Sequence, residues 1–366
     1  MVDWSSLPVE LLGLIARQLR FAQDYVRFGA VCKSWRRVIL QRDGTLCSLL
    51  PLLMLAEKEF SDLREFCCPL TDRMLKLYLP EIRGKRCWGS SDGWLVTIGA
   101  DFQMCLLNPL TRKQILLPPL HKCSNLNTLI CSPEEFRDYF VCKVVLTSSP
   151  ASSSCVILAI YSDFAKMALA KLGDESWTPL QSSSCLFLDV IYFGGQLYAI
   201  DSLGNIMIYS ICGSCIETIP SNLIQSEDEL EDRLLYLVDI GGQVHVVQRY
   251  VSEILTTQTP ERKTWKFEIY KLEAVSHKLE EINCLGDWSI FVGNNHSFAV
   301  STSDHPECCS NCIYFTDDYS GISDPISHGY DVGIYIFENH KIQPFIGEDV
   351  SPARFSVPLW FRPVLV

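Results

Sequence analysis

Apolar residues recur at helical intervals near the start of the chain, at Leu11, Leu12, Ile15 and Leu19. This spacing predicts a helix of about three turns with one apolar stripe, which we expect to be buried. Pro8 suits the first turn because its φ is fixed, and Glu10 lies where the helix dipole favours an acid. A first helix should therefore begin near Pro8.

The helical pattern restarts after Phe21, with apolar residues at Tyr25, Phe28, Val31, Trp35 and Val38. Asp24 is the candidate N-cap of this second stretch. Two or three short helices should follow one another here. So short a segment buries too little surface to be stable alone, so it needs a partner protein or the rest of the chain.

From Gly44 onward the pattern changes to short alternating runs of β-branched and aromatic residues, separated by Gly, Asp, Asn and Ser. The clearest unit is 186–219, where four predicted strands are joined by short turns that contain glycine. Strands joined so closely form an antiparallel meander, because a parallel return needs a crossover of about a dozen residues or more.

The four-strand unit repeats along the chain. The Gly-Gly-Gln of residues 194–196 recurs at 241–243, and similar units occupy 87–117, 138–180, 234–283 and 288–345, the last enlarged by an insertion at 301–311. Meanders repeated at about forty to fifty residues are typical of a β-propeller. A sixth unit can be assembled from 51–80 and the C-terminal 354–361, and it would close the ring by pairing its edges.

The expected fold is a small all-α domain, residues 1–43, followed by an all-β propeller, residues 44–366. Six blades are favoured, and five or seven remain open. A pair of β-sandwiches, the alternative all-β architecture, does not readily explain glycine turns that recur at one period.

Composition and charge narrow the classes of function. The chain has 366 residues, 48% of them hydrophobic, and a net charge of −12, although its first 43 residues carry seven basic and four acidic side chains. The acidic remainder lacks the clustered Lys and Arg that phosphate binding needs, so we expect no nucleic-acid partner.

Seventeen cysteines, an odd number, without a signal-peptide-like start favour reduced thiols in the cytoplasm or nucleus. No apolar run approaches the roughly 20 residues of a membrane span, so we expect no membrane partner.

Two groups of residues resemble a known family. The first resembles an F-box, the motif that docks onto the Skp-type adaptor of a cullin-RING ubiquitin ligase; it consists of Leu7-Pro8, Glu10-Leu11-Leu12, Ile15, Leu19 and Val31-Cys32-Lys33-Ser34-Trp35-Arg36. In the second group, Asn108-Pro109-Leu110-Thr111-Arg112 resembles the first blade of many plant F-box proteins. Residues 285–287, 293–295, 311–318 and Trp360-Phe361 resemble the kelch-like, KIB-type propellers of a plant domain-of-unknown-function family. The resemblance implies a plant substrate receptor of a Skp-cullin-F-box ligase.

The resemblance also implies which residues dock. The adaptor-binding residues would be Leu7, Pro8, Leu11, Leu12, Ile15, Leu19, Val31, Cys32 and Trp35, burying apolar surface against the adaptor's helices. The propeller would hold a target protein, whose identity stays open, near the enzyme that transfers ubiquitin. The structural alternative is a helical hairpin packed on its own domain.

Two sets of side chains are candidates for metal binding or for catalysis. His305, Cys308, Cys309 and Cys312 contain enough ligands for a tetrahedral zinc site. Because all four lie within one short loop, we expect loop cysteines, no metal and no cofactor. Asp201 and the pair Asp317-Asp318 are candidate catalytic acids, although Asp after a strand is more often a turn former.

The leading hypothesis is a non-catalytic adaptor, because the chain contains no nucleophile elbow, phosphate loop or HExxH motif. The alternative is a propeller hydrolase that cleaves glycans and uses the helices as a cap, which predicts clustered acids in the central pocket. A third hypothesis is an F-box protein that acts outside a ligase, as a competitive decoy. The face of the propeller that binds the target stays open in all three.

Overall fold

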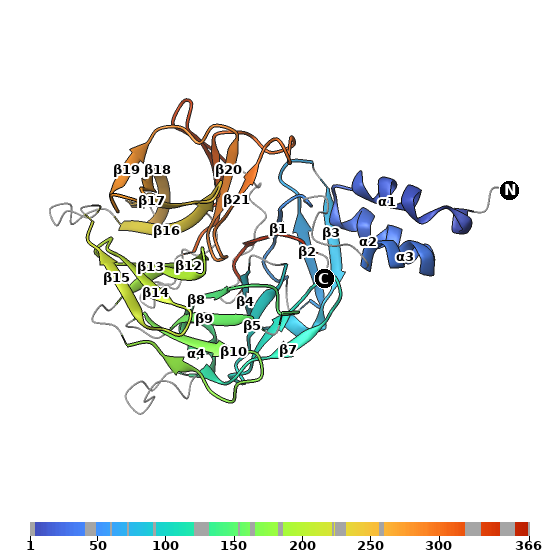
Figure 1. The fold of residues 1–366 in the computed structure, drawn as a ribbon, viewed down its shortest axis with the longest axis horizontal. Helices are drawn as coiled ribbons and strands as arrows, with labels where there is room; N and C mark the ends of the chain where they lie inside the picture. The colour runs from blue at the N-terminus through green and yellow to red at the C-terminus, as the bar shows by residue number, and fades with distance from the viewer. Residues whose placement is uncertain are drawn as a thin grey trace.

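The computed structural model describes residues 4–40, 49–58, 61–71, 73–90, 93–120, 132–152, 154–161, 165–181, 186–221, 223, 232–255, 260–318, 331–344 and 356–364 of the chain. Three short helices project from a ring of β-sheets (Figure 1). They are α1 (Val9–Arg17), α2 (Ala22–Ala30) and α3 (Lys33–Leu40), preceded by the 3-10 turn η1 (Trp4–Ser6). The expected domain boundary at 43/44 lies outside the described residues.

The described part of the ring consists of six sheets, numbered here as blades 1 to 6. Blade 1 contains β25 (Leu359–Phe361), β1 (Leu52–Met54), β2 (Leu63–Cys67) and β3 (Met74–Tyr78). The 3-10 turn η2 (Pro80–Ile82) leads to blade 2, with β4 (Arg86–Gly89), β5 (Leu95–Ile98), β6 (Met104–Leu107) and β7 (Gln114–Leu116). Blade 3 contains β8 (Val141–Leu146), β9 (Val156–Tyr161), β10 (Lys166–Lys171) and β11 (Thr178–Pro179).

The other three blades complete the ring. Blade 4 contains β12 (Phe187–Phe193), β13 (Gln196–Asp201), β14 (Ile206–Ser210) and β15 (Cys215–Ile219). Blade 5 contains β16 (Asp232–Ile240), β17 (Gln243–Leu255), β18 (Pro260–Leu272) and β19 (Leu279–Ile282). Blade 6 contains β20 (Trp288–Val292), β21 (Phe298–Ser301), β22 (Cys312–Phe315), β23 (Gly333–Ile336) and β24 (Lys341–Pro344). The predicted order, a helical segment followed by a six-blade propeller, is confirmed.

The ring is closed by the C-terminal strand. β25 pairs antiparallel with β1, with Leu53 opposite Trp360 and Met54 opposite Leu359. Strands from the two ends of the chain thus form one sheet, as the sequence predicted, and no edge is left open at this seam. The predicted strand ends at 345 and 354–355 lie outside the described residues.

Buried polar contacts tie neighbouring blades together near the axis. On β12, the carboxylate of Asp189 accepts a hydrogen bond from the backbone N–H of Leu237 on β16 (2.8 Å) and pairs with Lys143 of β8. Burial raises the pKa of Asp189, and the Lys143 ammonium opposes that shift. One side chain therefore joins the inner strands of blades 3, 4 and 5.

Blade 6 departs from the predicted meander. Its strand order is β21-β20-β22-β23-β24, and β20 runs parallel to β22, with Ser289 opposite Cys312. A parallel pair needs a long connection, and residues 302–311 provide it between β21 and β22. The predicted insertion therefore serves as a crossover, and β21 becomes an additional inner strand.

A further difference lies before blade 3. The sequence predicted a strand from Asp138, whereas this residue belongs to the helix α4 (Pro133–Tyr139). Ser132 is the N-cap: its hydroxyl accepts from the Glu135 N–H (3.1 Å), and the Glu135 carboxylate accepts from the Ser132 N–H (2.8 Å). This reciprocal capping box favours helix over strand here.

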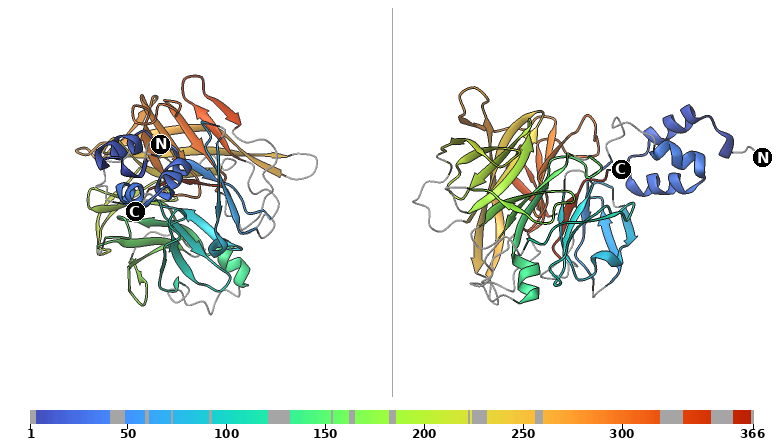
Figure 2. Two further views of the ribbon diagram at one scale, coloured as in Figure 1. Left: turned by 90° about the vertical axis from the view of Figure 1, so that its right-hand side faces the viewer. Right: turned by 60° about the horizontal axis from the view of Figure 1, so that its bottom comes forward.

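Helix α2 attaches the helical segment to blade 1. Phe21, Ala22 and Tyr25 are fully buried in the cluster that contains Leu50 and Phe66. The helices still extend away from the ring (Figure 2), and none in the described ranges combines the length and apolar character needed to cross a bilayer.

Asp24 strengthens this attachment and does not cap α2 as predicted, since the N-cap is Phe21. Its carboxylate accepts two hydrogen bonds from Arg73 of the propeller, at 2.7 and 2.8 Å. The same guanidinium lies 4.1 Å from the centre of the Phe21 ring. A bidentate ion pair and a cation–π contact therefore fix the orientation of the helices relative to the ring.

Candidate protein-docking site

Helix α1 has two apolar faces. Leu12 and Ala16 are buried against Phe28 of α2 and Val38 of α3, and form the small core of the helical segment. Leu11, Leu14 and Ile15, at spacings of three and four, are 47%, 56% and 39% exposed. The second face lies outside the segment's own core, so α1 is apolar on a side that nothing in the described chain covers.

Exposed apolar side chains are concentrated on the helices. We define the docking face as the large exposed apolar residues of this segment, which are Trp4, Val9, Leu11, Leu14, Ile15, Val26 and Val31. Isolated exposed leucines are normal on a soluble protein, whereas several within so short a segment mark an interaction surface.

Of the three predicted docking residues at the junction of α2 and α3, one lies on the surface and two contribute to the fold. Val31 is exposed, whereas Cys32 is half-buried with its sulfur 2.9 Å from the Ser34 hydroxyl. The Trp35 ring lies 4.4 Å from the Phe28 ring, and its indole N–H donates to the Trp4 carbonyl (3.1 Å). Trp35 therefore holds η1 and α3 together.

The nine residues predicted to bind an adaptor thus occupy different environments. Pro8, Leu11, Ile15 and Val31 are exposed; Leu7, Leu19, Cys32 and Trp35 are half-buried; and Leu12 is buried. The expectation of one buried stripe on α1 was wrong, because its apolar residues divide between two sides. Four residues of the docking face were not predicted: Trp4, Val9, Leu14 and Val26. For α1 a signal was present, because a helix that is apolar on several sides indicates additional burial.

Comparison with known proteins identifies both parts of the chain. Residues 62–336 match the KIB1-4 beta-propeller family, and residues 4–43 match the F-box-like family. The chain belongs to the KIB1-4 beta-propeller family. The predicted F-box and KIB-type propeller are therefore confirmed.

Its relatives include F-box proteins of Arabidopsis thaliana. F-box protein At2g26160 is 24% identical, covering 86% of this chain and 96% of its own. F-box protein SKIP23 is 23% identical, covering 94% and 91%, and putative F-box protein At1g65770 is 27% identical, covering 87% and 90%. Among solved structures, apo AztD from Citrobacter koseri has a TM-score of 0.37 at 11% identity over 68% of this chain and 62% of that chain, which is too weak to bear on function.

The Asn-Pro-Leu-Thr-Arg sequence at residues 108–112 has a structural explanation. The buried Asn108 side chain accepts hydrogen bonds from the N–H groups of Leu110 (3.1 Å) and Thr111 (2.9 Å). These bonds form the turn between β6 and β7, in which Arg112 has a left-handed φ of 61°. The motif therefore shapes a turn.

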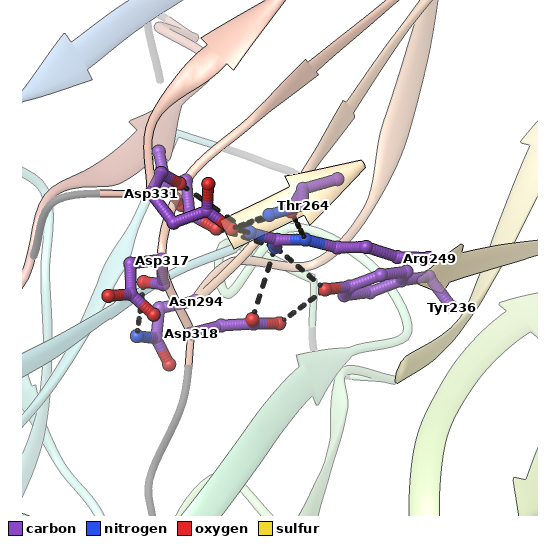
Figure 3. A network of polar contacts seen from close by, with 8 residues as sticks. Tyr236, Arg249, Thr264, Asn294, Asp317, Asp318 and Asp331 are labelled. Carbon is purple, nitrogen blue, oxygen red and sulfur yellow. Dashed lines mark hydrogen bonds and ion pairs between the residues drawn. The ribbon is translucent and has the colours of Figure 1, made fainter. Parts of the chain in front are cut away.

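The candidate acids Asp317 and Asp318 lie beside a buried arginine that joins blades 5 and 6 of the KIB1-4 propeller (Figure 3). Arg249 donates to Asp331 (2.7 Å), to the Thr264 hydroxyl (2.7 Å) and to the Thr316 carbonyl (2.8 Å). Burial opposes its charge, but Tyr236, Asp331 and Asp318 raise the pKa of Arg249 above its ordinary value. The Asp318 carboxylate lies 3.3 Å from the guanidinium. Asp318 is thus the counter-charge of a structural cation.

The acids do not meet in the centre of the ring. We define the central cavity as the space of about 380 Å³ lined by Leu146, Thr147, Ser148, Ile191, Tyr192, Asp239, Gly241, Gly242, Trp288, His296, Ser297, Phe298, Ala299 and Arg362. Its lining includes one carboxylate, Asp239, and the candidate Asp201 instead accepts from the N–H groups of Leu203 and Asn205 in a turn. The carboxylate pair that the glycan-hydrolase alternative predicted is not part of this lining.

The candidate zinc ligands form part of the blade 6 crossover. Among the described residues, no group of three or more His, Cys, Asp or Glu is placed to hold a metal ion. Burial raises the pKa of Cys308 and Cys312 to about 12, so both are thiols in the metal-free chain. Burial lowers the pKa of His305 to about 4, and this buried ring packs within the loop as a neutral side chain.

Proposed function

We propose that this F-box protein is the substrate receptor of a Skp-cullin-F-box ubiquitin ligase. In this proposal the docking face binds a Skp-type adaptor, the adaptor connects the chain to a cullin-RING ligase, and the propeller binds the target protein. The role is non-catalytic and is carried out in the cytoplasm or nucleus. The single observation that carries the proposal is the docking face, which remains apolar and uncovered on helices that match the F-box.

The energetics of this face suit a stable protein partner. Full burial of a Leu, Ile or Val side chain stabilises by about 1.5–3 kcal/mol, so several such side chains supply the affinity of a specific complex. The neighbouring basic residues Arg17, Lys33 and Arg36 are exposed and favour an acidic partner surface around the apolar centre.

The attachment of the F-box to blade 1 supports the second half of the proposal. Phe21 and Tyr25 are fully buried against the propeller, and Asp24 is held by Arg73. A target bound on the propeller is thereby kept in a fixed direction from the adaptor. Ubiquitin transfer then gains from proximity and orientation, without any bond chemistry by this chain.

The test compares matched substitutions of exposed leucines. We expect the double variant Leu11→Asp/Ile15→Asp to lose co-purification with a plant Skp-type adaptor, because two charges would face the apolar partner. The control Leu63→Asp changes a leucine that is 50% exposed on β2 and should bind normally. Leu12→Asp is unsuitable, since Leu12 is buried and the F-box itself would unfold.

Reconstitution with cullin, RING protein and ubiquitin-conjugating enzyme separates receptor from decoy. A receptor supports ubiquitination of proteins captured by the propeller, whereas a decoy binds the adaptor and supports none. Full adaptor binding by Leu11→Asp/Ile15→Asp would refute the docking proposal.

A further inference from the structure

The central cavity lies where inner strands of several blades end. Ser148 follows β8, Asp239 is near the end of β16, and Arg362 directly follows β25, while His296 precedes β21. In Figure 1 these inner strands surround the axis of the ring. A volume of about 380 Å³ falls in the range of small-ligand sites.

Several polar atoms of this cavity lack a partner among the described residues. They are both ring nitrogens of His296 and the hydroxyls of Ser148 and Ser297, all buried, and Ser297 is only 1% exposed. A buried polar atom without a hydrogen bond is unfavourable, so a bound group that supplies hydrogen bonds would be favoured here.

The backbone at His296 is held in place by two hydrogen bonds. The His296 N–H donates to the Gly89 carbonyl (2.8 Å), and its carbonyl accepts from the Asn295 side chain (2.8 Å). The segment before β21 is thereby attached to β4 of blade 2. A donor side chain on a fixed backbone has less freedom to lose when a ligand binds.

The electrostatics at His296 favour an anion. Burial lowers the pKa of His296 to about 3, and the charged groups that add to this shift are two cations, Lys143 and Arg362. The ring is therefore neutral, with one N–H to donate. Lys143 is paired with Asp189, so the cation in the cavity lining is Arg362. Asp239, the carboxylate of the lining, has one oxygen engaged by the Gly242 N–H (2.9 Å).

The other wall of the cavity is aromatic. Trp288, Tyr192 and Phe298 line it, and the Trp288 ring lies so close to Gly241 that a Cβ there would be 3.2 Å from the ring. Gly241 also has a left-handed φ of 60°, so glycine is favoured at this position for two reasons. An apolar body attached to the anion would contact this wall.

We propose that the central cavity binds a carboxylate that carries a small apolar group, with Arg362, Ser148, Ser297 and His296 as donors and Trp288 as the apolar wall. Two kinds of ligand present such a carboxylate: a free organic acid and the C-terminus of a polypeptide. The cavity lies at the end of the ring that carries the F-box, because Phe361, next to Arg362, pairs with Leu52 of β1, and Leu50 bonds to the Arg20 carbonyl (3.0 Å). A polypeptide bound there would approach from the F-box side. The proposal does not depend on adaptor binding.

The first arm of the test uses small probes with the full-length chain. Calorimetric titration with benzoate and phenylacetate should show binding, and their neutral amides, benzamide and phenylacetamide, should bind at least tenfold more weakly. Arg362→Gln should weaken benzoate at least tenfold and Ser297→Ala severalfold. The control Arg112→Gln, which removes an exposed arginine outside the lining, should have no effect.

The second arm identifies the source. An acetylated Gly-Gly-Phe peptide with a free C-terminus is compared with its C-terminal amide. Preference for the free-acid peptide over both benzoate and phenylacetate indicates a polypeptide end, and the reverse indicates an organic acid. Equal binding of acids and amides, unchanged binding in both Arg362→Gln and Ser297→Ala, or no binding of any carboxylate would overturn the proposal. Thermal unfolding of each variant, measured alongside, shows whether a loss of binding reflects unfolding.

Discussion

At the scale of single residues, Leu11 and Leu12 are neighbours in sequence with opposite roles. Because a helix turns by about 100° per residue, one side chain enters the F-box core and the other faces solvent. Leu12 is 1% exposed and Leu11 is 47% exposed. The chain thus stabilises its F-box and presents a partner surface from the same helix.

We expect Leu12→Ala to destabilise the F-box by about 2–5 kcal/mol, the range for a buried leucine, and Leu11→Ala by less than about 1 kcal/mol. Hydrogen exchange of the α1–α3 amides measures both effects. Leu11→Ala should instead bind the adaptor clearly more weakly, while its hydrogen-exchange rates stay unchanged. Equal exchange rates in the two variants would contradict this assignment.

Two buried histidines predict a pH dependence. The pKa of His296 is lowered to about 3 and that of His305 to about 4, in both cases chiefly by burial, from an ordinary 6.5. At a pH between the lowered pKa and the ordinary 6.5, the unfolded chain binds protons that the native chain does not. The free energy of unfolding therefore falls as pH is lowered through this range. Urea unfolding at pH 7 and pH 5 should differ by roughly 1–2 kcal/mol per histidine. His305→Gln should reduce this difference, and an unchanged difference would refute it.

At the scale of elements, α2 belongs to two packing units. Phe28 faces the F-box core, while Ala22 and Tyr25 face the propeller. The sequence showed apolar residues three positions apart along α2, at Ala22, Tyr25 and Phe28. It could not show that the first two pack against the propeller and the third against the F-box core. That contact depends on Arg73, which is 49 positions from Asp24.

We expect Arg73→Gln to loosen this attachment. The arginine lowers the pKa of Asp24, so the pair stabilises at pH values above the ordinary carboxyl pKa, 3.8, and the contribution is lost as pH falls below it. Hydrogen exchange of α2 should therefore be faster in the variant at pH 7, and the difference should shrink as pH falls below 3.8 toward the lowered pKa of Asp24; the part due to the cation–π contact with Phe21 should not depend on pH. Arg83→Gln, which removes a largely exposed pair with Asp62, is the control. A difference that does not shrink as pH falls below 3.8 would contradict the mechanism.

The sequence predicted most elements because each regular blade is local. In 186–219, alternation and short glycine turns determine the strands and their pairing, and β12 to β15 follow the prediction closely. Blade 6 could not be predicted in this way, because β20 pairs with β22 across a crossover and so depends on non-local contacts. Helix α4 was predictable in principle from its Ser132–Glu135 capping box.

The same distinction applies to the sites. The F-box leucines were recognisable from their spacing and motif, but which of them face outward depends on α3, whose packing the spacing does not determine. The central cavity combines residues from distant positions such as Ser148, His296 and Arg362, so no local pattern reveals it.

At the scale of the whole molecule, stability depends on the seam of blade 1. Trp360 is 1% exposed and meets Phe291 and Tyr314 of blade 6 edge to face, with ring centres 5.0 and 6.0 Å away. It therefore joins the last strand both to β1 and to the adjacent blade.

We expect Trp360→Ala to lower stability by about 3–5 kcal/mol, as for other buried aromatic truncations, because it opens the seam. Trp265→Ala, at a site that is 44% exposed, is the matched control and should cost less than about 1 kcal/mol. Thermal unfolding followed by near-ultraviolet circular dichroism measures both. Similar melting temperatures for the two variants would show that the seam is not critical.

The position of β25 has a consequence for biosynthesis. The blade that carries the F-box receives its inner strand, Leu359–Phe361, only after every other described strand has been made. During translation the helices emerge first, yet their platform is completed last. A ribosome that stops before β25 would release a chain in which blade 1, the support of the helices, lacks its inner strand.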